Sequence, residues 1–278
     1  FNMLLSRLSI SGAKLFGTTN PDKPTHWLKV KFMDNEKIES KYIAKFLLDD
    51  NTTLDKEYIE NLKKEYTGVF YERFILGNWV TAEGAIYLIY ANNPEAYSIK
   101  RENVPKLLYI NVGVDIGGNK SNHAIVATGI DESMNVYVLK SLSLKATGKG
   151  VQYILQKTKE LCEETEREYG FIDCVYPDNA EQAIVNTISA ALKWNVRGCY
   201  KCNIIDRIRC TDLLLSTHRL FLVEGENAAL DKGLKEAVWS DKEDDKRLDD
   251  GTSDIDILDA FEYSFEKFIK QLTREEYK

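Results

Sequence analysis

The residues best suited to chemistry in this sequence are carboxylates that follow expected strands or open the last expected helix. Asp115 ends a strand in the run Gly113–Gly118, and Asp178 directly follows the strand ending at Pro177. Asp256 and Asp259 are three residues apart near the start of the last helix, so they share one face. Several anionic carboxylates brought together repel one another unless a cation holds them. Oxygen ligands suit Mg²⁺ or Mn²⁺, and two such metals about 4 Å apart commonly cleave phosphodiesters.

Each of these aspartates also has an ordinary structural explanation when it is taken alone. Asp115 suits a turn at a strand end, and Asp178 suits the N-cap of the following helix. Asp254 fits a cap or a first-turn acid, while Asp256 and Asp259 favour the positive end of a helix dipole. Only the joint pattern, in this order along the chain, points to a metal-dependent site.

Composition places the chain among ordinary globular proteins. Its 278 residues are 44% hydrophobic and 29% charged, enough for one large domain or two small ones. No apolar run approaches the roughly 18–20 residues of a membrane span, and no secretion signal is expected. The net charge of −7 owes much to residues 241–259, so a local basic strip can still bind DNA. The odd number of cysteines, five, indicates reduced thiols in a cytoplasm.

The pattern of the segment up to Pro105 predicts the edge of a larger sheet, followed by a helical part and a polar connection. We expect Thr53 to cap the first of the two helices after residue 50. The expected elements are a helix over Phe1–Leu8, strands over Ala13–Thr19 and Trp27–Phe32, and helices over Thr53–Tyr66 and Gly68–Leu76.

From residue 106 the pattern becomes regular and predicts an α/β domain. Three β-rich runs separated by short turns indicate an antiparallel meander, and the order βββ-α-β-α fits a mixed sheet with helices on both faces. An RNase H-like fold uses that order. The expected strands are Leu108–Ile116, Ala124–Ile130, Val136–Ser143, Phe171–Tyr176 and Leu220–Val223. The expected helices are Gly148–Glu168, Ala180–Leu192, Ile204–Ser216, Asn227–Trp239 and Asp254–Leu272.

Six short motifs follow one another along nearly the whole chain. They are Leu15–Pro21, Gly77–Val80, Glu83–Tyr87, Val114-Asp115, Pro177-Asp178 and Asp256–Tyr263. Together they resemble the large subunit of tailed-phage terminases. In that family a Thr-Thr-Asn-like strand end lies in the packaging ATPase domain, and three acidic motifs lie in the nuclease domain. The last of these commonly reads Asp-Ala-x-x-Tyr, which Asp259–Tyr263 matches.

The resemblance implies a fold, an activity and partners. Residues 1–105 would be a C-terminal remnant of the packaging ATPase domain with its linker, and residues 106–278 an RNase H-like nuclease domain with a βββαβα core. The activity would be endonucleolytic cleavage of double-stranded, concatemeric phage DNA during genome packaging, in the cytoplasm of the bacterial host. The portal protein and the small terminase subunit would be partners in the full motor. Two Mg²⁺ or Mn²⁺ ions would be held by Asp115, Asp178, Asp256 and Asp259, the last as ligand or as support.

Two departures from the family pattern affect these expectations. Some relatives carry a histidine three residues before the Asp-Ala pair, where this chain has Asp256; the site is therefore harder and more anionic. No Gly-x-x-x-x-Gly-Lys-Ser/Thr phosphate loop occurs, so the ATPase motor is not in this chain.

Four further side chains are candidates for contact with DNA. Lys201, Arg207 and Arg209 are basic residues that could neutralise backbone phosphates, although a solvated helix face explains them equally well. His123 lies near Asp115 in sequence and is a candidate for contact with DNA or with the site. Residues 241–250 are expected to form a mobile surface loop beside the site.

Other functional classes remain open. Residues 115–121 look like the first phosphate loop of actin-like sugar kinases, but the second loop and the adenosine motif of such kinases are missing. A junction resolvase or an integrase core would keep the nuclease fold, and the Thr-Thr-Asn-Pro segment argues against both. A catalytically degenerate prophage module that only assembles with other packaging proteins is a third alternative.

Overall fold

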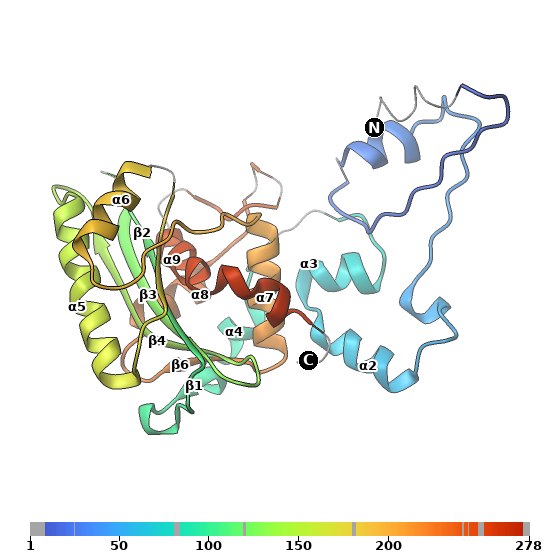
Figure 1. Ribbon diagram of the computed structural model, residues 1–278. Helices are drawn as coiled ribbons and strands as arrows, with labels where there is room; N and C mark the ends of the chain where they lie inside the picture. Colours follow the sequence, from blue (N-terminus) through green and yellow to red (C-terminus); the bar gives the residue numbers. More distant parts are fainter. Residues whose placement is uncertain are drawn as a thin grey trace.

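One mixed β-sheet with helices on both faces forms the centre of the main body of the molecule (Figure 1). A computed structural model describes residues 9–24, 26–80, 84–118, 121–179, 182–240, 242–243, 245–249 and 253–274. Within these residues six strands lie in the order β1-β6-β4-β3-β2-β5. They are β1 (Ser98–Ile99), β2 (Tyr109–Asp115), β3 (Asn122–Ile130), β4 (Val136–Lys145), β5 (Cys174–Pro177) and β6 (Leu220–Val223).

Helices make up most of the remaining regular structure. The longer ones in the described residues are α2 (Lys56–Glu65), α5 (Val151–Tyr169), α6 (Gln182–Ala191), α7 (Ile204–Ser216), α8 (Ala228–Glu236) and α9 (Ile255–Phe265). Short helices are α3 (Gly68–Phe70), α4 (Leu88–Asn92) and α10 (Ile269–Leu272). Single turns are η1 (Lys29–Met33), η2 (Leu48–Asp50), η3 (Tyr71–Ile75), η4 (Pro94–Tyr97), η5 (Arg101–Asn103) and η6 (Glu266–Phe268). No helix among them has the length and apolar character that a membrane crossing requires.

The middle of the sheet is the antiparallel meander that the sequence predicts. β2 pairs antiparallel with β3, and β3 with β4. After α5 the chain returns as β5, parallel to β2, while β6 lies parallel to β4 and β1 lies parallel to β6. Because parallel neighbours run in the same direction, β2 and β5 end at the same edge of the sheet.

Alternating side chains of the central strands build a core on each face. Ala124 and Val126 pack with α7, α8 and α9, while Ile125 and Ala127 pack with α5 and α6. Figure 1 shows these two groups of helices on opposite sides of the strands. The segment before residue 106 adds β1 and three buried tyrosines, and the division of the chain at 105/106 stays a prediction. These tyrosines are Tyr87, Tyr90 and Tyr97.

Helix α9 lies directly on the backbone of β2. A β-carbon at Gly113 would stand 1.9 Å from the carbonyl oxygen of Ala260 and 2.8 Å from the nitrogen of Ser264. Only glycine permits this approach, so Gly113 sets the distance between the first long strand and the last long helix.

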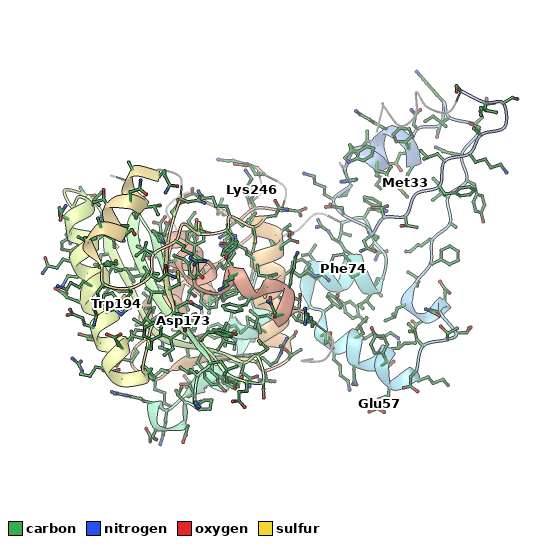
Figure 2. The ribbon with its side chains drawn as sticks, in the orientation of Figure 1. Met33, Glu57, Phe74, Asp173, Trp194 and Lys246 are labelled. Carbon is green, nitrogen blue, oxygen red and sulfur yellow. The ribbon has the colours of Figure 1, made fainter. Side chains whose placement is uncertain are left out.

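The part of the chain before α2 extends away from the sheet (Figure 1). Apolar side chains in residues 9–55 are largely in solvent, including Phe16 (86% exposed) and Tyr42 (92% exposed). In Figure 2 the side chains near Met33 spread around a thin loop of chain, whereas those near Asp173 fill the body that holds the sheet. This extended part shares little of the central core.

Both strands predicted in the extended part are wrong. Ala13–Thr19 has no regular structure, and Trp27–Phe32 is a helical turn that continues into η1. An isolated strand leaves its backbone groups unpaired, whereas this turn bonds locally, as from the amide of Asp34 to the carbonyl of Lys29 at 2.9 Å. The helix predicted over Phe1–Leu8 lies outside the described residues.

Several helix boundaries also differ from the prediction; the helix expected over Asn227–Trp239, for example, is α8 (Ala228–Glu236). The N-cap of α2 is Asp55, whose carboxylate accepts the amide N–H of Glu57 at 2.7 Å, because the hydroxyl of Thr53 is bonded to Asn51 instead. The last helix starts as predicted but is interrupted by η6, so that α9 and α10 are separate.

Candidate functional site

Two of the four predicted aspartates stand at the ends of neighbouring parallel strands. Asp115 is the last residue of β2, and Asp178 directly follows β5. In the register of these strands Val114 lies opposite Pro177, and the amide of Asp178 donates to the carbonyl of Val114 at 2.9 Å. Both aspartates therefore lie at one edge of the sheet.

The other two aspartates come from the first turns of α9. Asp256 accepts a hydrogen bond from the amide of Asn122, at the start of β3, over 2.6 Å. Asp254 caps the helix by accepting the amide N–H of Ile257, and it also bonds to the hydroxyl of Ser143 on β4. These contacts fix the start of α9 over β3 and β4.

The charges of the four aspartates act on one another. Burial raises the pKa of the Asp115 carboxyl well above its ordinary value. The other three aspartates raise it further, in the order Asp259, Asp256, Asp178. The pKa of Asp256 is also raised, first by burial, although the amide of Asn122 opposes the shift. The fold thus brings together all four aspartates, which we call the aspartate cluster.

The aspartate cluster has the chemistry of a site for a hard divalent cation. It offers carboxylate oxygens in a partly buried position, with mutual repulsion that a cation would relieve. With the side chains as they stand, no group of three or more His, Cys, Asp or Glu among the described residues is arranged to hold a metal ion. Asp178 and Asp259 are turned toward cationic side chains instead. The residue types fit Mg²⁺ or Mn²⁺, and their roles as ligands stay predictions.

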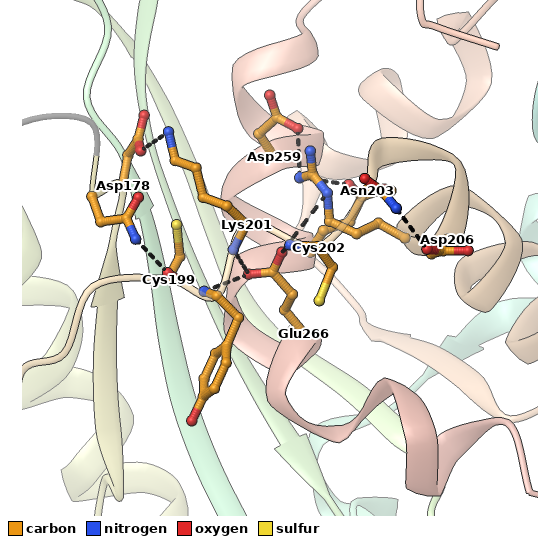
Figure 3. A network of polar contacts seen from close by, with 12 residues as sticks. Asp178, Cys199, Lys201, Cys202, Asn203, Asp206, Asp259 and Glu266 are labelled. Atoms are coloured by element: carbon orange, nitrogen blue, oxygen red, sulfur yellow. Dashed lines mark hydrogen bonds and ion pairs between the residues drawn. The ribbon is translucent and has the colours of Figure 1, made fainter. Parts of the chain in front are cut away.

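Lys201 provides the cation at Asp178. Its Nζ lies 2.6 Å from Oδ1 of Asp178, and its side chain is 44% exposed. Burial is the largest single effect on Lys201 and opposes the charge of its ammonium, but the hydrogen bond to Asp178 and the surrounding negative charges together outweigh it, so the pKa of Lys201 is raised. Figure 3 shows the side chain of Lys201 reaching from its turn to Asp178.

Two arginines provide the cations at Asp259. Nη1 of Arg207 and Nη1 of Arg247 lie 2.9 Å and 3.2 Å from its Oδ1. The same guanidiniums enclose Glu262, which is 0% exposed; Arg207 lies 3.0 Å from its Oε2, and Arg247 bonds to its Oε1. The hydroxyl of Tyr87 accepts from Arg247 at 2.9 Å. Asp259 is therefore held by a buried ionic network.

The residues predicted to bind DNA do not form one exposed strip. Arg207 is buried in this network, and Arg209 is half-buried, with its guanidinium 4.6 Å from the centre of the Phe74 ring. His123 is buried on β3, where its Nε2 lies 3.0 Å from the carbonyl oxygen of Lys149. Lys201 is the most exposed of the four, and all four DNA contacts stay predictions.

Sequence reasoning missed three charged residues around the cluster. Glu262 and Glu266 follow Asp259 at intervals of three and four residues, and this helical spacing could have revealed a common face. Arg247 lies in the predicted mobile loop 241–250. The buried side chain of Arg247 and its contact with Glu262 contradict a purely surface role for that loop.

Comparison with known proteins shows that the chain shares its fold with a solved structure. No protein-family model matches the chain, and no curated protein matches it. The solved large terminase of a thermophilic bacteriophage is similar to it, with a TM-score of 0.77 and 24% identity over 94% of this chain and 65% of that chain. The complex of the same terminase with ADP gives a TM-score of 0.78, with 24% identity over 97% of this chain and 65% of that chain. The chain thus spans about 65% of the length of that terminase, and the two share a fold.

A second solved protein overlaps less. The large terminase nuclease domain from bacteriophage SPP1 with bound Mn has a TM-score of 0.43 and 16% identity, over 58% of this chain and 88% of that chain. This overlap is too limited to support an argument about the site.

Proposed function

We propose that the chain is the nuclease part of a terminase large subunit, a metal-dependent endonuclease that cuts double-stranded phage DNA during genome packaging. The convergence of Asp115 and Asp178, from neighbouring strand ends, with Asp256 and Asp259, from the first turns of α9, carries the proposal. The fold shared with the large terminase of the thermophilic bacteriophage supports it. The order β2-β3-β4-α5-β5-α6 agrees with an RNase H-like core. We assign residues 106–278 to that nuclease domain and residues 1–105 to the ATPase-domain remnant and linker.

The proposed ligands are Asp115, Asp178 and Asp256, with Asp259 as a ligand or as a support for the others. One or two Mg²⁺ or Mn²⁺ ions, when bound, would supply an activated water and neutralise charge on the phosphate. The chain's own contribution is to hold the carboxylates in place: the amide of Asn122 holds Asp256, and two arginines hold Asp259. Burial of Asp115 strengthens the interaction of its charge with a cation.

Cleavage, and not movement of DNA, is the proposed activity of these residues. The sequence carries no Gly-x-x-x-x-Gly-Lys-Ser/Thr loop, so an ATP-driven motor would have to be supplied by other residues. In a complete packaging machine, in the cytoplasm of a bacterial host, the portal protein and the small terminase subunit would be its partners.

Plasmid cleavage in Mn²⁺ and in Mg²⁺ tests the proposal. We expect the 278-residue chain to cut with little sequence preference, and Asp115→Asn and Asp178→Asn each to lower the rate by more than about 100-fold, since each removes a charged ligand. Glu132→Gln, an exposed change in the turn between β3 and β4 at the far end of the sheet, is the matched control. Cutting that persists in both aspartate variants would overturn the proposal, and ATP turnover in the same assay would favour the kinase alternative.

A further inference from the structure

We propose that Lys201 is a built-in counter-ion of the aspartate cluster, which a divalent cation displaces and which then contacts a DNA phosphate. The proposal rests on the proposed function, because it takes Asp178 and Asp115 as ligands for the metal. It gives one side chain two successive partners, a carboxylate before the metal binds and a phosphate afterwards.

The ammonium group stands where a cation would stand. Nζ of Lys201 is 2.6 Å from Oδ1 of Asp178, and the charge of Asp115 also acts on it. The lysine therefore offsets part of the repulsion between the carboxylates at this sheet edge. A divalent ion bound to the same carboxylates would repel the ammonium and replace its effect.

The backbone of the turn is built to present this side chain. Lys201 has φ of 51°, a left-handed conformation that is uncommon for a residue with a β-carbon. The amides of Tyr200, Lys201 and Cys202 all donate to the carboxylate of Glu266, over 2.9, 3.2 and 2.7 Å. Glu266 is itself buried on η6, so a buried carboxylate fixes the unusual turn through three hydrogen bonds (Figure 3).

The turn is also attached to the strand that ends before Asp178. The amide of Cys199 donates to the carbonyl of Pro177 at 2.9 Å, and the side-chain amide of Asn179 donates to the carbonyl of Cys199 at 2.8 Å. Contacts on both sides thus fix the backbone of Lys201 relative to Asp178. The side chain keeps its freedom, because it is 44% exposed and has a flexible four-carbon stem.

An ordinary surface ion pair would make different predictions. It would add little to stability, and its removal would leave the affinity of the cluster for metal unchanged or would lower it. A counter-ion that competes with metal must instead weaken metal binding while it is present. The metal affinity of a lysine variant therefore separates the two explanations.

Mn²⁺ binding to the full 278-residue chain, measured by calorimetry without DNA, is the first test. We expect Lys201→Met to bind Mn²⁺ roughly tenfold more tightly than the parent chain, the size of a partly screened charge interaction. Lys201→Gly should show the same gain, since glycine adopts this φ freely and the turn is retained. Lys193→Met, an exposed lysine paired with Glu166, is the control and should bind as the parent does.

DNA binding in Ca²⁺ is the second test. Lys201→Met should weaken binding and lower the slope of log affinity against log salt by about one, because one phosphate contact is lost. In EDTA the same change should leave DNA affinity as it is in the parent, since Asp178 holds the ammonium there.

Equal or weaker Mn²⁺ binding by both lysine variants would overturn the counter-ion proposal. If Asp115→Asn abolishes Mn²⁺ binding and the lysine variants leave it unchanged, the counter-ion proposal is refuted and the proposed function stands. A parent chain that binds no Mn²⁺ at all would refute both.

Discussion

Glu262 offers the sharpest test of how the site is held, and we expect Glu262→Gln to destabilise the protein strongly. Its carboxylate is fully buried on α9 between Arg207 and Arg247, and the hydroxyl of Tyr87 lies 3.3 Å from its Oε1. Glutamine keeps the size of the side chain and removes the charge. Asp259 would then be the main remaining carboxylate for two buried guanidiniums.

The size of the effect follows from the burial of these charges. Removing one partner of a buried ion pair costs about 3–5 kcal/mol, because the other charge stays buried without compensation. Native proteins are stable by only about 5–15 kcal/mol, so this is a large share. At about 2–4 °C per kcal/mol, the melting temperature should fall by roughly 6–20 °C.

Urea unfolding followed by circular dichroism measures the loss, with Glu132→Gln as the exposed control. Adding Arg247→Met to Glu262→Gln should recover part of the stability, since it removes an uncompensated charge. The loss in free energy of unfolding of the double variant should therefore be smaller than the sum of the losses of the two single variants. A loss below about 1 kcal/mol for Glu262→Gln, additive with that of Arg247→Met, would refute the reasoning.

Two further predictions concern a close contact and a buried acid. Gly113→Ala should lower the free energy of unfolding by about 1–3 kcal/mol and weaken Mn²⁺ binding, because α9 must move away from β2. Gly17→Ala, which has open space around its β-carbon, is the control in the same titrations. Unchanged Mn²⁺ binding by Gly113→Ala would contradict the prediction. Burial raises the pKa of Asp212 from its usual 3.8 to about 6, so the stability from this group is complete below pH 4 and is lost as the pH rises through 6. Asp212→Asn, which still accepts the hydroxyl of Thr67, should raise the free energy of unfolding at pH 8 by up to about 3 kcal/mol, and a less stable variant at that pH would contradict this.

The fold from residue 106 onward could largely be predicted from the sequence. Strand β6 and helix α7 lie within the predicted bounds, because short apolar runs and helical periodicity there agree with the tertiary packing. The grouping of Asp115 with Asp178 was predictable for a similar reason: parallel strands end at a common edge, and each aspartate follows its strand directly.

The counter-ions were not predictable, because they depend on contacts between distant segments. Arg247 and Glu262 are separated by a stretch with no single pattern, and nothing in the acidic run around Arg247 signals a buried guanidinium. The two-residue strand β1 has too little sequence to register as periodic. The alternation in Trp27–Phe32 was misleading, since a strand needs a neighbour that this segment lacks among the described residues.

The contact of α9 with Gly113 also sets when the aspartate cluster can exist. Asp115 and Asp256 are 141 residues apart in the sequence (256 − 115), which a ribosome makes in roughly 7–28 s at about 5–20 residues per second. During that time the synthesised chain contains Asp115 and later Asp178, without the two aspartates of the last long helix. Docking of α9 completes the cluster in the same step that buries Phe261 and Phe265. A nascent chain whose α9 segment is still within the ribosome therefore has neither the full set of carboxylates nor a closed core.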